Sequence, residues 1–184
     1  MTDTATPLTY RIVIEASPKA VWDALTLPEW TERYGYGGRV EYDLRAGGKY
    51  SHKASAEMKA MGMPDEIIVG EVIESDPPRK LVHTWHPLFS ADTTAEPHTR
   101  IAYEINENQG GLCTVTLIHD VKGAPLVARM VPGGGDPAQG KPASGWRVRV
   151  LRSLVDCEAQ AQPCPELVEG RAARSYAVVR QAHH

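Results

Sequence analysis

The sequence has few cysteines, no excess of basic side chains and no long apolar run. Its 3 cysteines form no C-x-x-C pair, so neither a disulfide framework nor a thiolate zinc site is predicted. Lys and Arg number 20 against 23 Asp and Glu, and no segment interleaves basic with aromatic residues, which argues against a nucleic-acid-binding face. There is no signal-peptide pattern at the N-terminus and no stretch near the roughly 20 apolar residues that span a bilayer. We therefore expect a cytoplasmic protein with no nucleic-acid or membrane partner.

The chain length and composition fit one globular domain. A chain of 184 residues with 42% hydrophobic side chains can bury a real core, at this size roughly 70% of the extended-chain surface. The composition changes at the proline-rich start of the segment 163–184. We predict one domain over residues 8–160 and a C-terminal tail of uncertain structure over residues 161–184.

The first third of the chain predicts one strand and two short helices. LTYRIVIEA, residues 8–16, alternates apolar and polar side chains with the period of a half-buried strand. SPKAVWDALT follows, in which Ser17 is a helix cap, Pro18 suits the first helical position and Pro28 ends the helix. LPEWTERY predicts a second short helix, which ends at the glycines of 35–38.

The middle of the chain predicts six further strands joined by short Gly, Pro and Asn turns. They cover residues 39–44, 47–58, 65–75, 80–85, 99–106 and 113–120. Short turns between successive strands indicate an antiparallel meander. Residues 121–143 are rich in Gly and Pro and predict a long loop, whose apolar part at 126–131 is expected to be exposed. Residues 144–162 repeat apolar side chains at helical spacing and predict a long amphipathic helix.

These elements predict an α+β helix-grip fold. A seven-stranded curved antiparallel sheet cannot cover its own concave face, and the long C-terminal helix laid across it would do so. The space between sheet and helix would then be the place for a cavity.

Five segments carry a resemblance to a known family. In chain order they are IEASPKAVWDALT (14–26), LRAGGKY (44–50), GEVIESDPPRKLVHTW (70–85), GGLCTVTLIHD (110–120) and GW (145–146). Together they resemble the START-like (SRPBCC) superfamily of helix-grip proteins, and within it the bacterial proteins similar to the activator of heat-shock protein 90 ATPase. The resemblance implies a seven-stranded sheet gripping a C-terminal helix around an apolar pocket. The fold hosts lipid carriers, cyclases, hydrolases and co-chaperone domains alike.

Strand alternation predicts which side chains face the cavity. In KLVHTW the apolar Leu81 and Trp85 share a face with His83, whereas His86 looks outward. The same argument extends to the other strands, and Trp146 opens the gripping helix. The predicted ligand-binding residues are Tyr50, His52, Val69, His83, Trp85, Tyr103, Leu117, His119 and Trp146.

Three histidines among these residues leave several roles open. His52, His83 and His119 can be structural, can orient a ligand by hydrogen bonds, or can act as a metal or acid/base set. None lies in an H-x-H or H-x-x-x-H pair, so no metal and no cofactor are predicted.

The favoured function is a binding module that holds an apolar or aromatic small molecule between sheet and helix. One alternative is an enzyme of the cyclase or hydrolase kind that uses an inward His with a Tyr as acid and base. Another is a co-chaperone-like interaction domain. A monomer and a homodimer are both compatible with the sequence.

Overall fold

The computed structural model describes residues 7–32 and 38–131. In these ranges the strands are β1 (Leu8–Glu15), β2 (Val40–Tyr42), β3 (Lys49–Lys53), β4 (Glu66–Asp76), β5 (Lys80–Pro87), β6 (Thr99–Glu107) and β7 (Leu112–Asp120). The helices are α1 (Pro18–Thr26), α2 (Pro28–Thr31), α3 (Ala56–Ala60), α4 (Ala91–Thr94) and α5 (Pro125–Met130).

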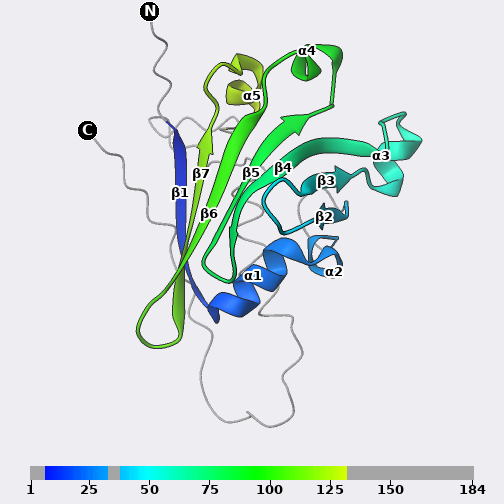
Figure 1. Cartoon of the computed structure of the whole chain (residues 1–184). Coiled ribbons are helices and arrows are strands. Elements are labelled where there is room, and N and C mark those ends of the chain that lie inside the picture. Colours follow the sequence, from blue (N-terminus) through cyan, green and yellow to red (C-terminus); the bar gives the residue numbers. More distant parts are fainter. Residues whose placement is uncertain (1–6, 33–37, 132–184) are drawn as a thin grey trace, which may run out of the picture.

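All seven strands join one antiparallel, curved sheet in the order β1-β7-β6-β5-β4-β3-β2 (Figure 1). The predicted α+β fold with a seven-stranded antiparallel sheet is confirmed. β1 reaches the sheet beside β7, the last of the described strands, so residues distant in sequence meet across that pair. The predicted long helix at 144–162, the rest of the predicted loop (132–143) and the tail lie outside the described residues. None of the described helices is long and apolar enough to cross a membrane.

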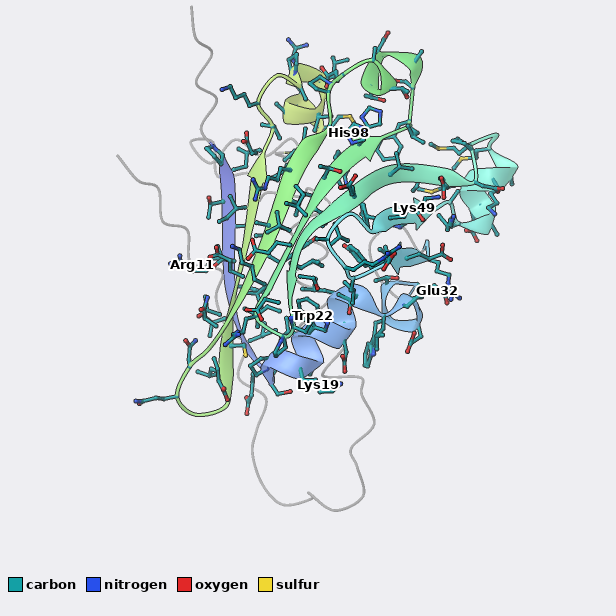
Figure 2. The ribbon with its side chains drawn as sticks, viewed as in Figure 1. Arg11, Lys19, Trp22, Glu32, Lys49 and His98 are labelled. Carbon is teal, nitrogen blue, oxygen red and sulfur yellow. The ribbon has the colours of Figure 1, made fainter. Side chains whose placement is uncertain are left out.

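Helix α1 forms for the local reasons visible in its sequence. Ser17 Oγ accepts a hydrogen bond from the Ala20 amide at 3.2 Å, and Pro18 occupies the first turn. One side of the helix buries Val21 and Trp22 in the same apolar cluster as the sheet. Figure 2 shows Trp22 on α1, at the end of the sheet opposite to His98. Helix α1 contacts β6 and β2.

The predicted strand 47–58 is wrong in its second half. β3 ends at Lys53, where a bulge interrupts its pairing with β4. Ser55 then caps α3, its hydroxyl accepting a hydrogen bond from the Met58 amide at 3.3 Å. A polar capping side chain outweighs the weak alternation of this segment, so the chain turns into a helix.

The predicted loop at 121–143 is wrong at residues 125–130, whereas residues 121–124 form the expected turn. Residues 125–130 form α5, and the Glu96 carboxylate holds its start by accepting hydrogen bonds from the Leu126 amide at 2.7 Å and the Val127 amide at 2.9 Å. Val127 and Val131 are buried in the core, Leu126 is half-buried and Met130 is exposed, so the apolar stretch 126–131 is exposed only in part. The helix α4, capped by Ser90, is a further element that the sequence pattern did not predict.

A carboxylate between two lysines makes stability depend on pH at the β3–β4 edge. Lys49 and Lys53 each donate to Glu66 Oε1 at 2.7 Å, and these hydrogen bonds lower the pKa of Glu66 to about 2. Since the ordinary value is 4.5, the stabilisation is complete above about pH 4.5 and is lost as the pH falls through the folded pKa.

We therefore expect Glu66→Gln to flatten the loss of stability between about pH 4.5 and pH 2.5, measured by urea unfolding at several pH values, with an effect of order 1 kcal/mol. Glu41→Gln is the matched control, because Glu41 lies 3.6 Å from the Lys53 ammonium. Equal acid profiles for Glu66→Gln and the wild type would refute this assignment.

Candidate ligand-binding site on the inner face of the sheet

The strand register places most of the predicted site residues on one face of the sheet. His83 on β5 lies opposite Ile101 on β6, and Ile101 lies opposite His119 on β7. One row further, Tyr103 lies between Leu81 and Leu117. Directly opposed residues share a face, so these rows form one surface, here called the inner face. It is the face that carries the buried apolar core.

The same register extends the inner face across β4, β3 and β2. Val72 lies opposite His83, Tyr50 lies opposite Gly70 and Tyr42, and His52 lies between Ile68 and Val40. The structure therefore brings together seven of the nine predicted residues: Tyr50, His52, His83, Trp85, Tyr103, Leu117 and His119. Trp146 lies outside the described residues.

Val69 does not belong to this set. It pairs with Ser51 and His86, one position out of step with the inner-face rows, and so lies on the outer face. The prediction failed because β4 reads Glu-Ile-Ile-Val and buries Ile67 as well as Ile68, so apolar character does not identify the inner face there.

His86 also lies on the outer face, as expected from alternation, but it is not solvated. It is 7% exposed, and its ring stacks on that of His98 with centroids 4.3 Å apart and an interplanar angle of 11°. Burial, with a smaller contribution from His98, lowers the pKa of His86. Figure 2 shows His98 at the end of the sheet opposite to α1.

An aromatic cluster surrounds His83. The rings of Tyr42 and Tyr50 stack with centroids 4.8 Å apart, and His83 lies 4.2 Å from Tyr50 and 6.1 Å from Tyr103. His83 Nδ1 is 2.8 Å from the Thr84 carbonyl oxygen, and the Tyr42 hydroxyl is 3.4 Å from His83 Nε2. A carbonyl only accepts, so Nδ1 carries the proton and Nε2 is left as an acceptor.

Burial decides the protonation of this cluster. The ring of His83 is 1% exposed, and desolvation lowers its pKa to about 4, although the hydrogen bond to Thr84 acts in the opposite direction. Desolvation likewise raises the pKa of Tyr50 far above its ordinary value. At neutral pH the His83 imidazole and the Tyr50 phenol are therefore both uncharged.

His119 is the second buried histidine of the inner face, and its environment differs. Its Nε2 lies 2.6 Å from Thr99 Oγ1, and Thr99 Oγ1 donates to the Trp85 carbonyl at 2.9 Å. The indole of Trp85 meets the His119 ring edge-on, with centroids 5.5 Å apart. His119 Nδ1 is buried and has no hydrogen-bond partner in the part of the chain that the structure describes. Such a group in an apolar surface points to a missing ligand or water.

His52 occupies the β3 part of the inner face. Burial lowers its pKa to about 4, partly offset by a hydrogen bond to the backbone of Gly38. A methyl group added at Gly38 would lie 3.0 Å from His52 Nε2 and 2.0 Å from the Lys53 carbonyl oxygen, so only glycine fits there. His52 is thus tightly packed against the backbone at the β3 edge of the inner face.

Tyr42 and Thr99 complete the site and were not predicted. The alternation of Val40 and Tyr42 would have placed the tyrosine on the inner face. Thr99 is the first residue of β6 and aligns with Ile101, so the same signal was available for it. Its role in holding His119 depends on a contact across twenty positions of sequence, which no local pattern reveals.

The comparisons with known proteins address the fold. A family model described as "Activator of Hsp90 ATPase homolog 1-like protein" matches residues 15–156. The chain belongs to this family. The resemblance drawn from the sequence is thereby confirmed. No curated protein matches the chain.

Solved structures that are similar to this chain agree with the family assignment. An HSP90 activator from Plasmodium falciparum is 18% identical, with a TM-score of 0.57 over 84% of this chain and 97% of that one. A protein from Mesorhizobium loti is 15% identical, with a TM-score of 0.58 over 86% of this chain and 100% of that one. CalU16 from Micromonospora echinospora is 18% identical, with a TM-score of 0.51 over 84% and 86%. At these identities the likeness establishes the fold alone.

The described residues do not support a metal site. Within residues 7–32 and 38–131, no three His, Cys, Asp or Glu side chains cluster as a metal site would require. His83 and His119 flank Ile101 on the strands either side of β6, so two strand spacings, about 10 Å, separate them. His83 and His119 therefore belong to two separate sites.

The Thr99–His119 contact makes a testable contribution to stability. We expect Thr99→Val, which keeps the shape, to lower the free energy of unfolding by about 2 kcal/mol, because it leaves His119 Nε2–H buried and unsatisfied. Thr116→Val is the matched control. Thr116 is also buried, but it accepts from the exposed Arg11, whose guanidinium can turn to water, so a change within about 0.5 kcal/mol is expected. Equal losses in urea unfolding would argue against the buried hydrogen bond.

Proposed function

We propose that this chain is a cytoplasmic binding module that holds an apolar or aromatic small molecule over the inner face of its sheet. The single observation that carries the proposal is His119 Nδ1, a buried acceptor that has no partner among the described residues and lies in a surface made mostly of aliphatic and aromatic side chains. Ligand sites have this composition: a large apolar lining that gives affinity and a few polar atoms that give orientation.

The aromatic cluster around His83 supports the same proposal. Tyr42 is half-buried, whereas Tyr50, His83 and Tyr103 are buried, so the cluster leads from the edge of the sheet to its middle. Tyrosines in such a position offer flat apolar area together with a hydroxyl. They suit the ring of an aromatic ligand.

NMR mapping with naphthalene-class probes tests the proposal. We expect 2-methoxynaphthalene to shift the amide signals of inner-face residues such as Ile101 and Leu117 in a saturable way. Outer-face residues such as Val13 and Ala102 are the internal control and are expected to stay in place. If no aromatic or aliphatic probe shifts the inner face in a saturable way, the proposal is wrong.

A co-chaperone role is the second candidate, and the comparisons favour it. The matching family is described by its likeness to an activator of Hsp90 ATPase, and one of the similar structures is an HSP90 activator. Calorimetric titration with purified Hsp90, combined with its ATPase rate, separates the two. Saturable binding with a raised ATPase rate, together with an inner face that takes no small molecule, would favour the co-chaperone.

An acid/base enzyme is the third candidate, favoured by the contact between Tyr42 and His83 Nε2 at 3.4 Å. A general acid or base works best with a pKa near the operating pH, whereas burial lowers that of His83 to about 4. His83 is therefore a weak base for chemistry near pH 7, and binding remains the better-supported function. A turnover that is lost in both Tyr42→Phe and His83→Gln would reverse this order.

A further inference from the structure

We infer that the small molecule bound by this site is an uncharged apolar compound that donates a hydrogen bond, from a hydroxyl or N–H group, to His119 Nδ1. Carboxylates and phosphates are excluded as its natural ligands. The inference rests on the proposed binding function and specifies the chemistry of the ligand.

The tautomer of His119 is set by its neighbours. The Thr99 hydroxyl has one proton and donates it to the Trp85 carbonyl at 2.9 Å, an oxygen that can only accept. Thr99 Oγ1 must therefore accept from His119 Nε2, which lies 2.6 Å away. In the neutral ring a proton on Nε2 leaves Nδ1 as a lone pair, so His119 presents an acceptor and no donor to the ligand.

The position of this acceptor indicates a ligand that is otherwise apolar. His119 is fully buried, its cross-strand neighbours are Ile101 and Leu8, and the edge of Trp85 meets its ring. Nδ1 has no hydrogen-bond partner among residues 7–32 and 38–131. A buried lone pair of this kind stays unsatisfied unless a ligand or a water brings a donor to it.

His83 presents the same polarity on the same face. Its Nδ1 proton is held by the Thr84 carbonyl at 2.8 Å, so Nε2 is the atom that accepts, within 3.4 Å of the Tyr42 hydroxyl. One row of the sheet thus carries two accepting nitrogens, one on each side of Ile101. The lowered pKa of His83 keeps that ring neutral at physiological pH.

The charge of the inner face argues against an anionic ligand. Among the inner-facing residues of the described strands there is no Lys or Arg, and Glu107 lies at the far end of β6, opposite Cys113. A carboxylate or phosphate bound beside His119 would lose its hydration without meeting a cation, and would face the lone pair of Nδ1. A phenol, alcohol or indole-type N–H satisfies Nδ1 without that cost.

Three naphthalenes that differ in one group test the inference by calorimetry at pH 7: 2-naphthol, 2-methoxynaphthalene and 2-naphthoate. We expect 2-naphthol to bind about tenfold more tightly than 2-methoxynaphthalene, because only the former donates to Nδ1, and 2-naphthoate to bind most weakly. His119→Phe keeps a flat ring and is expected to bind the first two compounds equally. Thr99→Val is the second variant, because it frees the tautomer while keeping the imidazole, and it is expected to reduce the preference for 2-naphthol.

The outcomes separate the inference from the proposed function. If 2-naphthol and 2-methoxynaphthalene bind the wild type equally, the hydrogen bond to His119 is refuted and the binding module stands. Tightest binding of 2-naphthoate would refute the uncharged class of ligand. A preference for 2-naphthol that persists in His119→Phe would assign the acceptor to another group. If no compound binds in a saturable way, the proposed function fails and the inference fails with it.

Discussion

Acidification from pH 7 to pH 4.5 is expected to lower the free energy of unfolding by about 2 kcal/mol through His83 alone, since each pKa unit corresponds to about 1.4 kcal/mol. Burial lowers the pKa of this ring from 6.5 to about 4 in the folded state. The unfolded chain therefore takes up a proton as the pH falls through 6.5, whereas the folded chain does not until about pH 4. The stabilisation is complete above about pH 6.5 and is lost between the two values. His52 has the same shift for the same cause and adds a loss of similar size.

The variant His83→Gln tests this expectation by urea unfolding at closely spaced pH values. Its stability at pH 7 can differ from that of the wild type, so the informative quantity is the slope of stability against pH. Between pH 6.5 and 4.5 the stability of the variant is expected to depend less steeply on pH. The difference in slope corresponds to about one proton fewer taken up on unfolding. Glu66→Gln is the control, because its effect falls in the lower window between about pH 4.5 and 2.5. Superimposable slopes of His83→Gln and the wild type would show that the ring is not buried in neutral form.

Gly70→Ala is expected to be among the most destabilising single changes in the sheet, at about 3 kcal/mol. A methyl group at Gly70 would lie 2.0 Å from the carbonyl oxygen of Thr84 on the neighbouring strand. That oxygen is also the acceptor for His83 Nδ1 at 2.8 Å, so it cannot move away without loosening the ring. The absence of a side chain at Gly70 thus makes room for the carbonyl that orients His83.

The matched control for this change is Gly111→Ala. Gly111 has φ +76° and no atom within 4 Å of the added methyl, so only backbone strain of about 1 kcal/mol is expected. Thermal and urea unfolding compare the two variants. In addition, the Nδ1–H signal of His83 is expected to shift in Gly70→Ala and to stay in place in Gly111→Ala. A Gly70→Ala variant that is no less stable than Gly111→Ala would contradict the close approach of Thr84.

Period-two alternation predicted most of the inner face from the sequence. It placed His83 with Trp85, and His119 with Leu117, because β5 and β7 keep an unbroken pleat over those residues. It failed at Val69, since β4 contains consecutive buried residues and bulges in its pairing with both neighbours. A bulge changes the face of every later residue, and the sequence carries no clear mark of where it falls.

The helices that were missed are short and depend on single capping groups. Ser55 and Ser90 each start a helix by accepting hydrogen bonds, and α5 is held by a carboxylate thirty residues earlier in the chain. The first two signals are local and were outweighed by the surrounding apolar pattern. The third is a tertiary contact. The tautomer of His119 also depends on a tertiary contact, because Thr99 on another strand accepts the hydrogen bond from its Nε2.

We infer that His119 offers a lone pair at Nδ1 to a ligand that donates a hydrogen bond. The most direct measurement is a long-range proton–nitrogen NMR correlation of the histidine rings at pH 7, recorded before and after addition of 2-naphthol. We expect an Nε2–H tautomer in the free protein. With 2-naphthol, but not with 2-methoxynaphthalene, the nitrogen chemical shift of Nδ1 is expected to move toward the value of a protonated nitrogen. A proton on Nδ1 in the free protein would contradict this inference. So would an Nδ1 chemical shift that stays unchanged at saturation with 2-naphthol as well as with 2-methoxynaphthalene.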